Sequence, residues 1–144
     1  ILQKVLTISE DATLTEAEVA KVVGAPQGAL VNGFLQALGA RDIAAALKIF
    51  HGAIDNGVEP RVFVLLAVMK VRGVLLLRFA PAMEKELAEQ FGPDDVAVLK
   101  ELAGKEGAAI NAALLAELIA ALIETPRAPL PTLPLELALY RALA

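Results

Sequence analysis

Side chains that could carry out chemistry are few in this sequence. His51 is the one histidine, and Lys48 occupies the position at which a Glu-x-x-His metal motif requires glutamate. We therefore interpret His51 as a structural residue, exposed or half-buried. Ser9 is the one serine and cysteine is absent, which excludes serine and thiol nucleophiles, disulfides and zinc fingers. The sequence contains neither a phosphate-binding loop motif nor a nucleophile-elbow motif.

Three acidic residues lie at informative positions. Asp94 and Asp95 directly follow Pro93, so we interpret them as first-turn acids favoured by the helix dipole, in preference to a catalytic pair of carboxylates. Glu117 lies within the apolar segment 109–124. Because a buried charge is costly unless it is paired, Glu117 is predicted to face the rim of the fold or to meet an arginine or lysine.

Three basic residues, Lys70, Arg72 and Arg78, interrupt an apolar segment that extends from residue 62 to residue 79. Two interpretations stay open. In the first, the aliphatic stems of the three side chains run along the apolar surface and carry their charges to the edge of a helical bundle. In the second, Arg72 joins a buried ion pair or contacts a neighbouring subunit.

The composition predicts the kind of element that positions these side chains. The chain has 144 residues, the size of one domain, and is 57% hydrophobic with a mean hydropathy of +0.62, which excludes intrinsic disorder. Alanine (28) and leucine (25) are strong helix formers, whereas there are only six aromatic residues. The fold class is therefore predicted to be all-α, a compact multi-helix bundle. The net charge of −4 offers no basic patch for nucleic acid.

Apolar spacing, capping residues and helix breakers predict seven to nine helices. Asp42 is predicted to cap one of them, and Pro60 to begin the longest. The four prolines between residues 125 and 134 exclude regular helix in that segment. The predicted helices cover residues 1–9, 15–24, 27–38, 43–56, 60–79, 83–90, 93–102, 109–124 and 135–143.

Neither of the two most apolar segments is predicted to span a membrane. Residues 62–79 contain three basic side chains, each of which costs about 2.5–3.5 kcal/mol at the centre of a bilayer. Residues 108–123 are shorter than the roughly 20 apolar residues that a span requires, and they include an acid. Residues 1–9 lack the features of a signal peptide, and the first residue is not methionine, so we expect the sequence to be a piece of a longer chain.

Four segments, in order, resemble the region that follows the ATPase core in the gamma/tau subunit of the bacterial DNA polymerase III clamp loader. Residues 1–24, ILQKVLTISEDATLTEAEVAKVVG, are similar to the end of the small AAA+ lid domain. Residues 34–63 are similar to paired helices around a Gly-x-x-Asp-x-x-x-Ala-Leu turn, followed by a Gly-x-x-Pro connection. Residues 64–78, VLLAVMKVRGVLLLR, resemble a long helix with an internal arginine, and residues 122–143 resemble the closing proline-containing segment and its helix.

The resemblance implies two domains: residues 1–24 end an AAA+ lid, and residues 25–144 form a helical collar that holds clamp-loader subunits together. It implies a cytoplasmic parent protein, part of the polymerase (a transferase) holoenzyme, that uses ATP and magnesium to load the sliding clamp in DNA replication. The ATPase motifs are absent here, so we expect no catalysis, cofactor or metal in these residues. We also expect neither direct nucleic-acid binding nor membrane binding. The implied partners are the other loader subunits: further copies of this chain, delta and delta-prime.

We expect the subunit interface to be helical. The helices at 61–78 and 109–124 have more apolar surface than one small bundle can cover, which predicts self-association. Two alternatives stay open, the corresponding domain of the delta subunit and an α-helical domain that binds an apolar small molecule or lipid; an enzyme ranks behind both. Four side chains are expected at the interface: Arg72, Leu135, Leu139 and Tyr140.

Overall fold

The computed structural model describes residues 25–105 and 109–144, and within those ranges the chain forms helices and no strands. This confirms the predicted all-α fold. The helices predicted at residues 1–9 and 15–24, and with them the expected lid segment, lie outside the described residues. The elements in chain order are α2 (Ala25–Gly39), α3 (Ile43–Asp55), α4 (Pro60–Phe79), the 3-10 helix η2 (Pro81–Met83), α5 (Glu84–Phe91), α6 (Pro93–Ala103), α7 (Ala112–Glu124), the 3-10 helix η3 (Thr125–Arg127) and α8 (Leu133–Leu143).

Capping residues and prolines set several of the boundaries. Asp42 caps α3 as predicted, because its carboxylate accepts a hydrogen bond of 3.0 Å from a backbone N–H of the first turn. Asn111 caps α7 in the same way at 2.9 Å, so this helix begins at Ala112 and not at the predicted residue 109. Helix α8 begins at Leu133, ahead of its predicted start, because Pro134 fits the first turn, where no N–H is needed.

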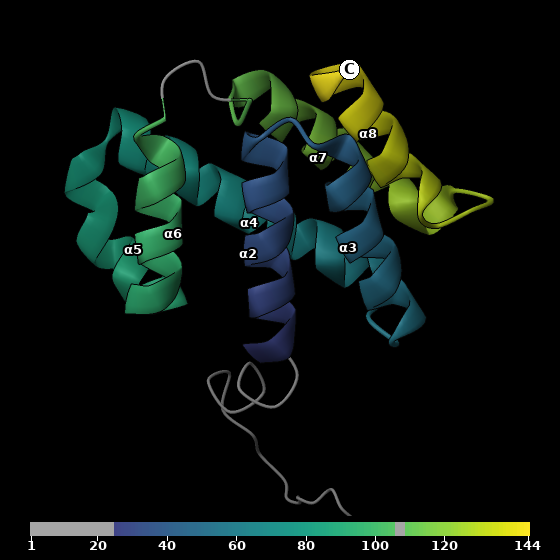
Figure 1. Ribbon diagram of the computed structural model, residues 1–144, viewed down its shortest axis with the longest axis horizontal. Helices are drawn as coiled ribbons and strands as arrows, with labels where there is room; N and C mark the ends of the chain where they lie inside the picture. The colour runs from purple at the N-terminus through teal and green to yellow at the C-terminus, as the bar shows by residue number, and fades with distance from the viewer. Residues whose placement is uncertain (1–24, 106–108) are drawn as a thin grey trace, which may run out of the picture.

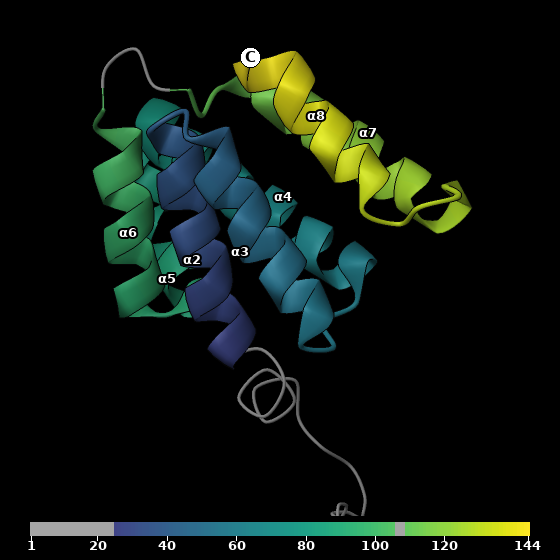
Figure 2. The ribbon, with the colours of Figure 1, turned by 45° about the vertical axis from the view of Figure 1, so that its right-hand side comes forward.

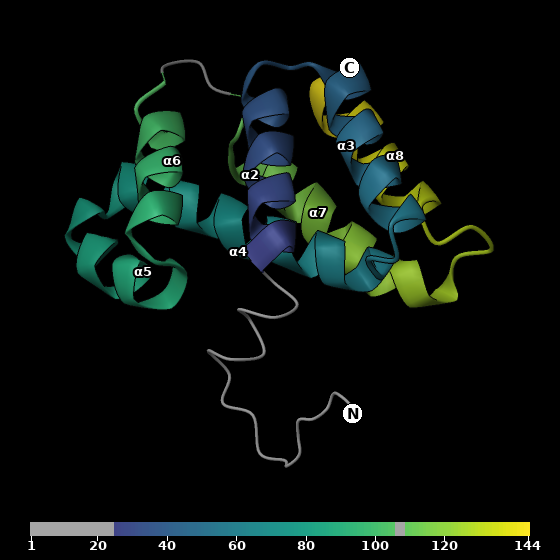
Figure 3. The ribbon, with the colours of Figure 1, turned by 60° about the horizontal axis from the view of Figure 1, so that its bottom comes forward.

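Helix α4 is the centre of the fold. It lies behind the antiparallel pair α2–α3, with the pair α5–α6 at one end and the pair α7–α8 at the other (Figure 1). Figure 2 shows α8 lying over α7 on the side of the molecule away from α5 and α6, and Figure 3 shows α4 running beneath α2 toward α5. Helix α4 packs directly against α2, α6 and α7. No helix of the described ranges is long and apolar enough to cross a membrane.

Three phenylalanines from three helices form the centre of the core. Phe34 of α2, Phe50 of α3 and Phe63 of α4 have no exposed surface. The ring centroids of Phe34 and Phe63 are 5.1 Å apart in an edge-to-face arrangement, and those of Phe50 and Phe63 are 5.0 Å apart. Aromatic pairs with this geometry stabilise a core beyond the area that they bury. The cluster therefore fixes the pair α2–α3 onto the first half of α4.

The second half of α4 packs closely against α6. Gly73 provides the close approach, since a Cβ atom at this position would lie 2.9 Å from Cδ1 of Leu99. Arg78 then donates hydrogen bonds to the backbone carbonyls of Ala103, at 3.2 Å, and Ile110, at 2.6 Å. The first of these carbonyls lies in the last turn of α6, where intrahelical donors are missing. Arg78 thus satisfies the end of α6 and joins it to the residues that lead into α7.

Candidate functional site

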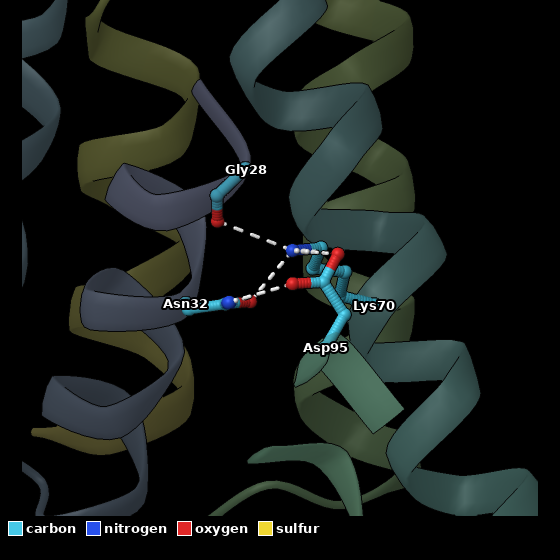
Figure 4. Close-up of polar contacts among 4 residues, drawn as sticks. All are labelled: Gly28, Asn32, Lys70 and Asp95. Carbon is cyan, nitrogen blue, oxygen red and sulfur yellow. Dashed lines mark hydrogen bonds and ion pairs between the residues drawn. The ribbon is translucent and has the colours of Figure 1, made fainter. Parts of the chain in front are cut away.

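Lys70 is the one buried charged side chain in the described part of the chain, with 2% of its surface exposed. It lies in the middle of α4 and points toward α2 and α6 (Figure 4). Its ammonium donates hydrogen bonds to Oδ1 of Asn32, at 2.6 Å, and to the carbonyl oxygen of Gly28, at 3.2 Å. The carboxylate of Asp95, on α6, lies 3.3 Å from the same nitrogen. Each of the two interpretations of the basic residues is wrong in part: Arg72 is exposed and forms no buried ion pair, whereas Lys70 does not reach the edge of the bundle and forms the buried ion pair itself.

These residues also contact each other without Lys70, through a fourth interaction. We name the group of Gly28, Asn32, Lys70 and Asp95 the Lys70 cluster. The side-chain amide of Asn32 donates a hydrogen bond of 2.9 Å to the other carboxylate oxygen of Asp95. An ammonium has three donors, and here each of them faces an acceptor. The cluster is therefore a satisfied polar network that joins α2, α4 and α6 at one point (Figure 4).

The electrostatics of the cluster are set by burial and by one counter-ion. Burial lowers the pKa of Lys70 below its usual 10.5, because desolvation disfavours the ammonium. The charge of the Asp95 carboxylate and its hydrogen bond oppose this effect, and they keep the decrease in pKa smaller than burial alone would make it. The side chain of Asp95 is 27% exposed, so it retains contact with water while it pairs with the lysine.

The cluster is not arranged for catalysis. A lysine nucleophile requires a lowered pKa and also access to a substrate. Lys70 has the first property only, because its side chain is 3% exposed and its three donors are occupied. It lines neither of the two surface grooves described for the chain. The arrangement instead fixes the position of α2 relative to α4 and α6.

The four predicted interface residues divide into two groups. Leu135 and Leu139 have no exposed surface, because their spacing of four residues places both on the inner face of α8, within the chain's own core. In this conformation they offer no surface to a partner. Arg72 is exposed and Tyr140 is 46% exposed. The interface role of these two stays a prediction.

The other singled-out residues take part in contacts between elements. His51 of α3 is 2.7 Å from Glu136 of α8, which confirms its interpretation as an exposed structural residue. Glu117 pairs with Arg141 at 3.8 Å across α7 and α8, as predicted for an acid in an apolar helix. Asp94 lies in the first turn of α6 as predicted, with Asp95 beside it. Across residues 25–105 and 109–144, no group of three or more acidic, histidine or cysteine side chains is placed to hold a metal ion.

Large apolar side chains are exposed on several helices of the described ranges, including α2, α4, α7 and α8. Phe79, the last residue of α4, is 77% exposed, and Ile123 near the end of α7 is 57% exposed. Ile119 lies one turn before Ile123 on the same side of α7, and Leu137 is exposed on α8. Isolated exposed apolar side chains are ordinary on protein surfaces, but Ile119, Ile123 and Leu137 belong to α7 and α8, which pack against each other.

A groove of about 320 Å³ lies between α7 and α8 and ends at η3. Its lining is mostly small and apolar, with an acidic rim on α7 and a basic rim on η3 and α8. The apolar lining includes Ala120, Ala121, Pro134, Leu137 and Ala138. The acidic rim is formed by Glu117 and Glu124, and the basic rim by Arg127 and Arg141.

The comparison with protein families identifies the chain. A family model described as DNA polymerase III subunits gamma and tau domain III matches residues 14–144. The chain belongs to this family. The match includes every described helix and confirms the resemblance found in the sequence. Comparisons with curated proteins and with solved structures found no match. The predicted division between residues 24 and 25 stays a prediction.

Two features of this gamma/tau domain III were not recognised in the sequence. The Lys70 cluster had a signal, because Asn32 and Lys70 are polar residues inside largely apolar helical segments, and such residues need partners where they are buried. The exposure of Phe79 had no comparable signal. A phenylalanine that ends an apolar helix has the same sequence context whether it is buried or exposed.

Proposed function

We propose that this domain III is an assembly domain, the collar, of the clamp-loader gamma/tau subunit. In this proposal it holds loader subunits together while ATPase modules elsewhere in the parent protein use ATP and magnesium to place the sliding clamp on DNA. The observation that carries the proposal is the exposed apolar surface on α4, α7 and α8. Membership of the gamma/tau domain III family supports it.

The energetics favour association of moderate strength. Complete burial of one large apolar side chain contributes about 1.5–3 kcal/mol, and the side chains concerned here are about half exposed. Covering the exposed side chains of α7 and α8 on one copy therefore contributes several kcal/mol. Association costs at least about 4 kcal/mol in lost translational and rotational freedom. We expect assembly that depends on concentration, and that is strengthened by the other loader subunits.

Sedimentation of the 144-residue chain over about a hundredfold range of concentration tests the proposal. We expect the average mass to rise with concentration, and Ile123→Glu to reduce the rise because it places a charge on the exposed face of α7. Ala97→Glu is the matched control, since Ala97 is exposed on α6 away from these faces. A chain that stays monomeric, and that also fails to bind the delta and delta-prime subunits, would contradict the proposal.

The proposal also assigns no chemistry to these residues. We expect no binding of ATP with magnesium in a calorimetric titration. We further expect little binding of duplex DNA at physiological salt, because a net charge of −4 provides few phosphate contacts. Nucleotide binding, or micromolar affinity for DNA at about 0.15 M salt, would contradict this part of the proposal.

The groove between α7 and α8 supports a second candidate, the binding of an apolar small molecule. Its volume of about 320 Å³ lies near the lower limit for small-molecule sites. Mass spectrometry after organic extraction distinguishes the two candidates. An acyl-type ligand that copurifies with the wild-type chain and not with Ala120→Gln would favour this candidate over assembly.

A further inference from the structure

We propose that the start of α2, residues 25–32, is a strap that unwinds while the rest of the domain stays folded, and that the Lys70 cluster is the latch that holds it closed. The strap connects residues 1–24 to the helical domain. Its use rests on the proposed function, because a strap that lengthens lets the segment ahead of α2 move while the assembly domain keeps its partners.

The two halves of α2 are held in different ways. Among residues 28–32 only Val31 is buried, whereas Ala29 and Leu30 are exposed. Four of the five residues 34–38 are buried, namely Phe34, Leu35, Ala37 and Leu38. A helical segment opens locally at a lower cost in free energy where few apolar side chains lose their contacts. The core therefore fixes the second half of α2 far more firmly than the first.

Polar contacts take the place of apolar packing at the start of α2. The side chain of Asn32 accepts a hydrogen bond from Lys70, at 2.6 Å, and donates one to Asp95, at 2.9 Å. The carbonyl of Gly28 accepts from Lys70 at 3.2 Å (Figure 4). These contacts tie the strap to α4 and α6, whereas the ion pair between Lys70 and Asp95, at 3.3 Å, joins α4 to α6 without α2. The latch can therefore open while α4 and α6 stay together.

The sequence of this region favours unwinding once the latch is open. Gly28 and Asn32 in the strap, and Gly33 directly after it, are weak helix formers. The first turn of α2 also has no acidic residue that would interact favourably with the helix dipole. Because Gly28 and Asn32 are only half-buried, water reaches their polar atoms after opening and satisfies them.

Release of the strap lengthens the connection to the domain. Eight residues span about 12 Å as an α-helix and at most about 26 Å as an extended chain. Unwinding residues 25–32 therefore adds up to about 14 Å of reach and frees the direction of the connection. In the proposed function, a module attached through residues 1–24 gains this reach without any change in the contacts of the assembly domain.

Thiol labelling tests the strap, because the chain contains no cysteine of its own. Val31→Cys places a buried thiol in the strap, and Leu38→Cys places one in the second half of α2. We expect an aromatic disulfide reagent to react at position 31 at least about tenfold faster than at position 38. Low urea should accelerate the reaction only at position 38, because local opening exposes little surface and global unfolding exposes much.

Asn32→Ala tests the latch, since it removes the side-chain contacts of α2 and leaves the ion pair of Lys70 with Asp95 in place. Alanine is the better helix former, so faster labelling can come only from the lost contacts. We expect labelling at position 31 to become about tenfold faster. Gln36→Ala is the matched control, because Gln36 is exposed one turn later in α2, and it should leave this rate unchanged.

Arg78→Met separates local opening from global unfolding. It removes contacts with the end of α6 and the residues before α7, so it should accelerate labelling at position 38 and leave position 31 unchanged. Equal rates at the two positions with the same dependence on urea, or equal acceleration of both by Arg78→Met, would overturn the strap. An unchanged rate at position 31 in Asn32→Ala would overturn the latch.

These measurements do not depend on association, so they are independent of the test of the proposed function. A chain whose two thiols react alike, but whose mass rises with concentration, overturns the strap and supports the assembly domain. A chain with the expected labelling that neither self-associates nor binds the delta and delta-prime subunits supports the strap and contradicts the assembly domain.

Discussion

Replacing Lys70 by methionine isolates the contribution of the Lys70 cluster to stability. Methionine retains the length and apolar stem of the lysine, but it donates no hydrogen bonds. The carbonyl of Gly28 and Oδ1 of Asn32 then lose a donor, and each unsatisfied buried acceptor costs about 1–3 kcal/mol. Both residues are half-buried, Asp95 stays partly hydrated, and the desolvation of the ammonium is relieved. We therefore expect a net loss of about 2 kcal/mol from the free energy of unfolding.

Urea denaturation at pH 7 measures this loss directly, and a thermal melt should show a Tm lower by roughly 6–8 °C. Lys48→Met is the matched control, because Lys48 is exposed on α3 and its removal should change the free energy of unfolding by less than about 0.5 kcal/mol. If Lys70→Met is as stable as the wild type, the desolvation of the buried ammonium outweighs its three contacts, and the interpretation of the cluster as a stabilising clamp is wrong.

The pH dependence of the free energy of unfolding, compared between the wild type and Lys70→Met, provides a second check. The pKa of Lys70 is lowered in the folded chain, so between that lowered value and 10.5 the unfolded chain binds more protons than the folded one. The free energy of unfolding contributed by this group therefore rises with pH across that window. We expect the stability difference between wild type and Lys70→Met to widen as the pH rises toward 10.5. A difference that narrows over this range would contradict the lowered pKa.

Four further substitutions test the packing, one helix cap and the contacts of Arg78 by urea denaturation. Gly73→Ala should lower the free energy of unfolding by about 1–3 kcal/mol, because the new Cβ would lie 2.9 Å from Leu99. Gly52→Ala on α3 meets no atom within 4 Å and should raise the free energy of unfolding by about 0.5–1 kcal/mol. Equal effects of the two substitutions would contradict the close approach at Gly73. Asp42→Ala should cost about 1 kcal/mol through the lost cap of α3, and an unchanged midpoint would exclude that cap. Arg78→Met should cost about 2 kcal/mol, since the backbone carbonyls of Leu102, Ala103 and Ile110 lose a charged donor. A loss below about 0.5 kcal/mol would show that water replaces it.

The positions of the helices were predictable because the signals for them are local. Prolines, glycines and caps such as Asp42 act within a few residues, so the described helices begin and end close to their predicted bounds. The start of α7 was predicted too early because two local signals, the apolar pattern and a capping side chain, disagree about where the helix begins. The apolar pattern extends back to residue 109, but the side chain of Asn111 satisfies the first turn and the helix begins after it.

The faces of the helices were not predictable to the same degree. Helix α4 is apolar nearly all round, so its sequence carries no periodicity that separates an inner from an outer side. The sequence therefore left open whether its basic residues reach the edge of the bundle or whether Arg72 forms a buried ion pair, and it did not indicate that Lys70 is the buried one. Leucines occur on both faces of α8, so the sequence does not distinguish Leu139, which is buried, from Leu137, which is exposed. Leu139→Asp would therefore unfold the domain, and it cannot serve as a test of association.

The central position of α4 has a consequence for how the chain folds. The pairs α2–α3, α5–α6 and α7–α8 each join neighbouring helices through a short sequence separation, so each pair can form with a small loss of loop-closure entropy. Because α2, α6 and α7 all pack on α4, opening one pair leaves the other two in place on the same helix. Amide hydrogen exchange should then be slowest at Val64, Ala67 and Val71, where it requires global unfolding, and faster in the outer pairs.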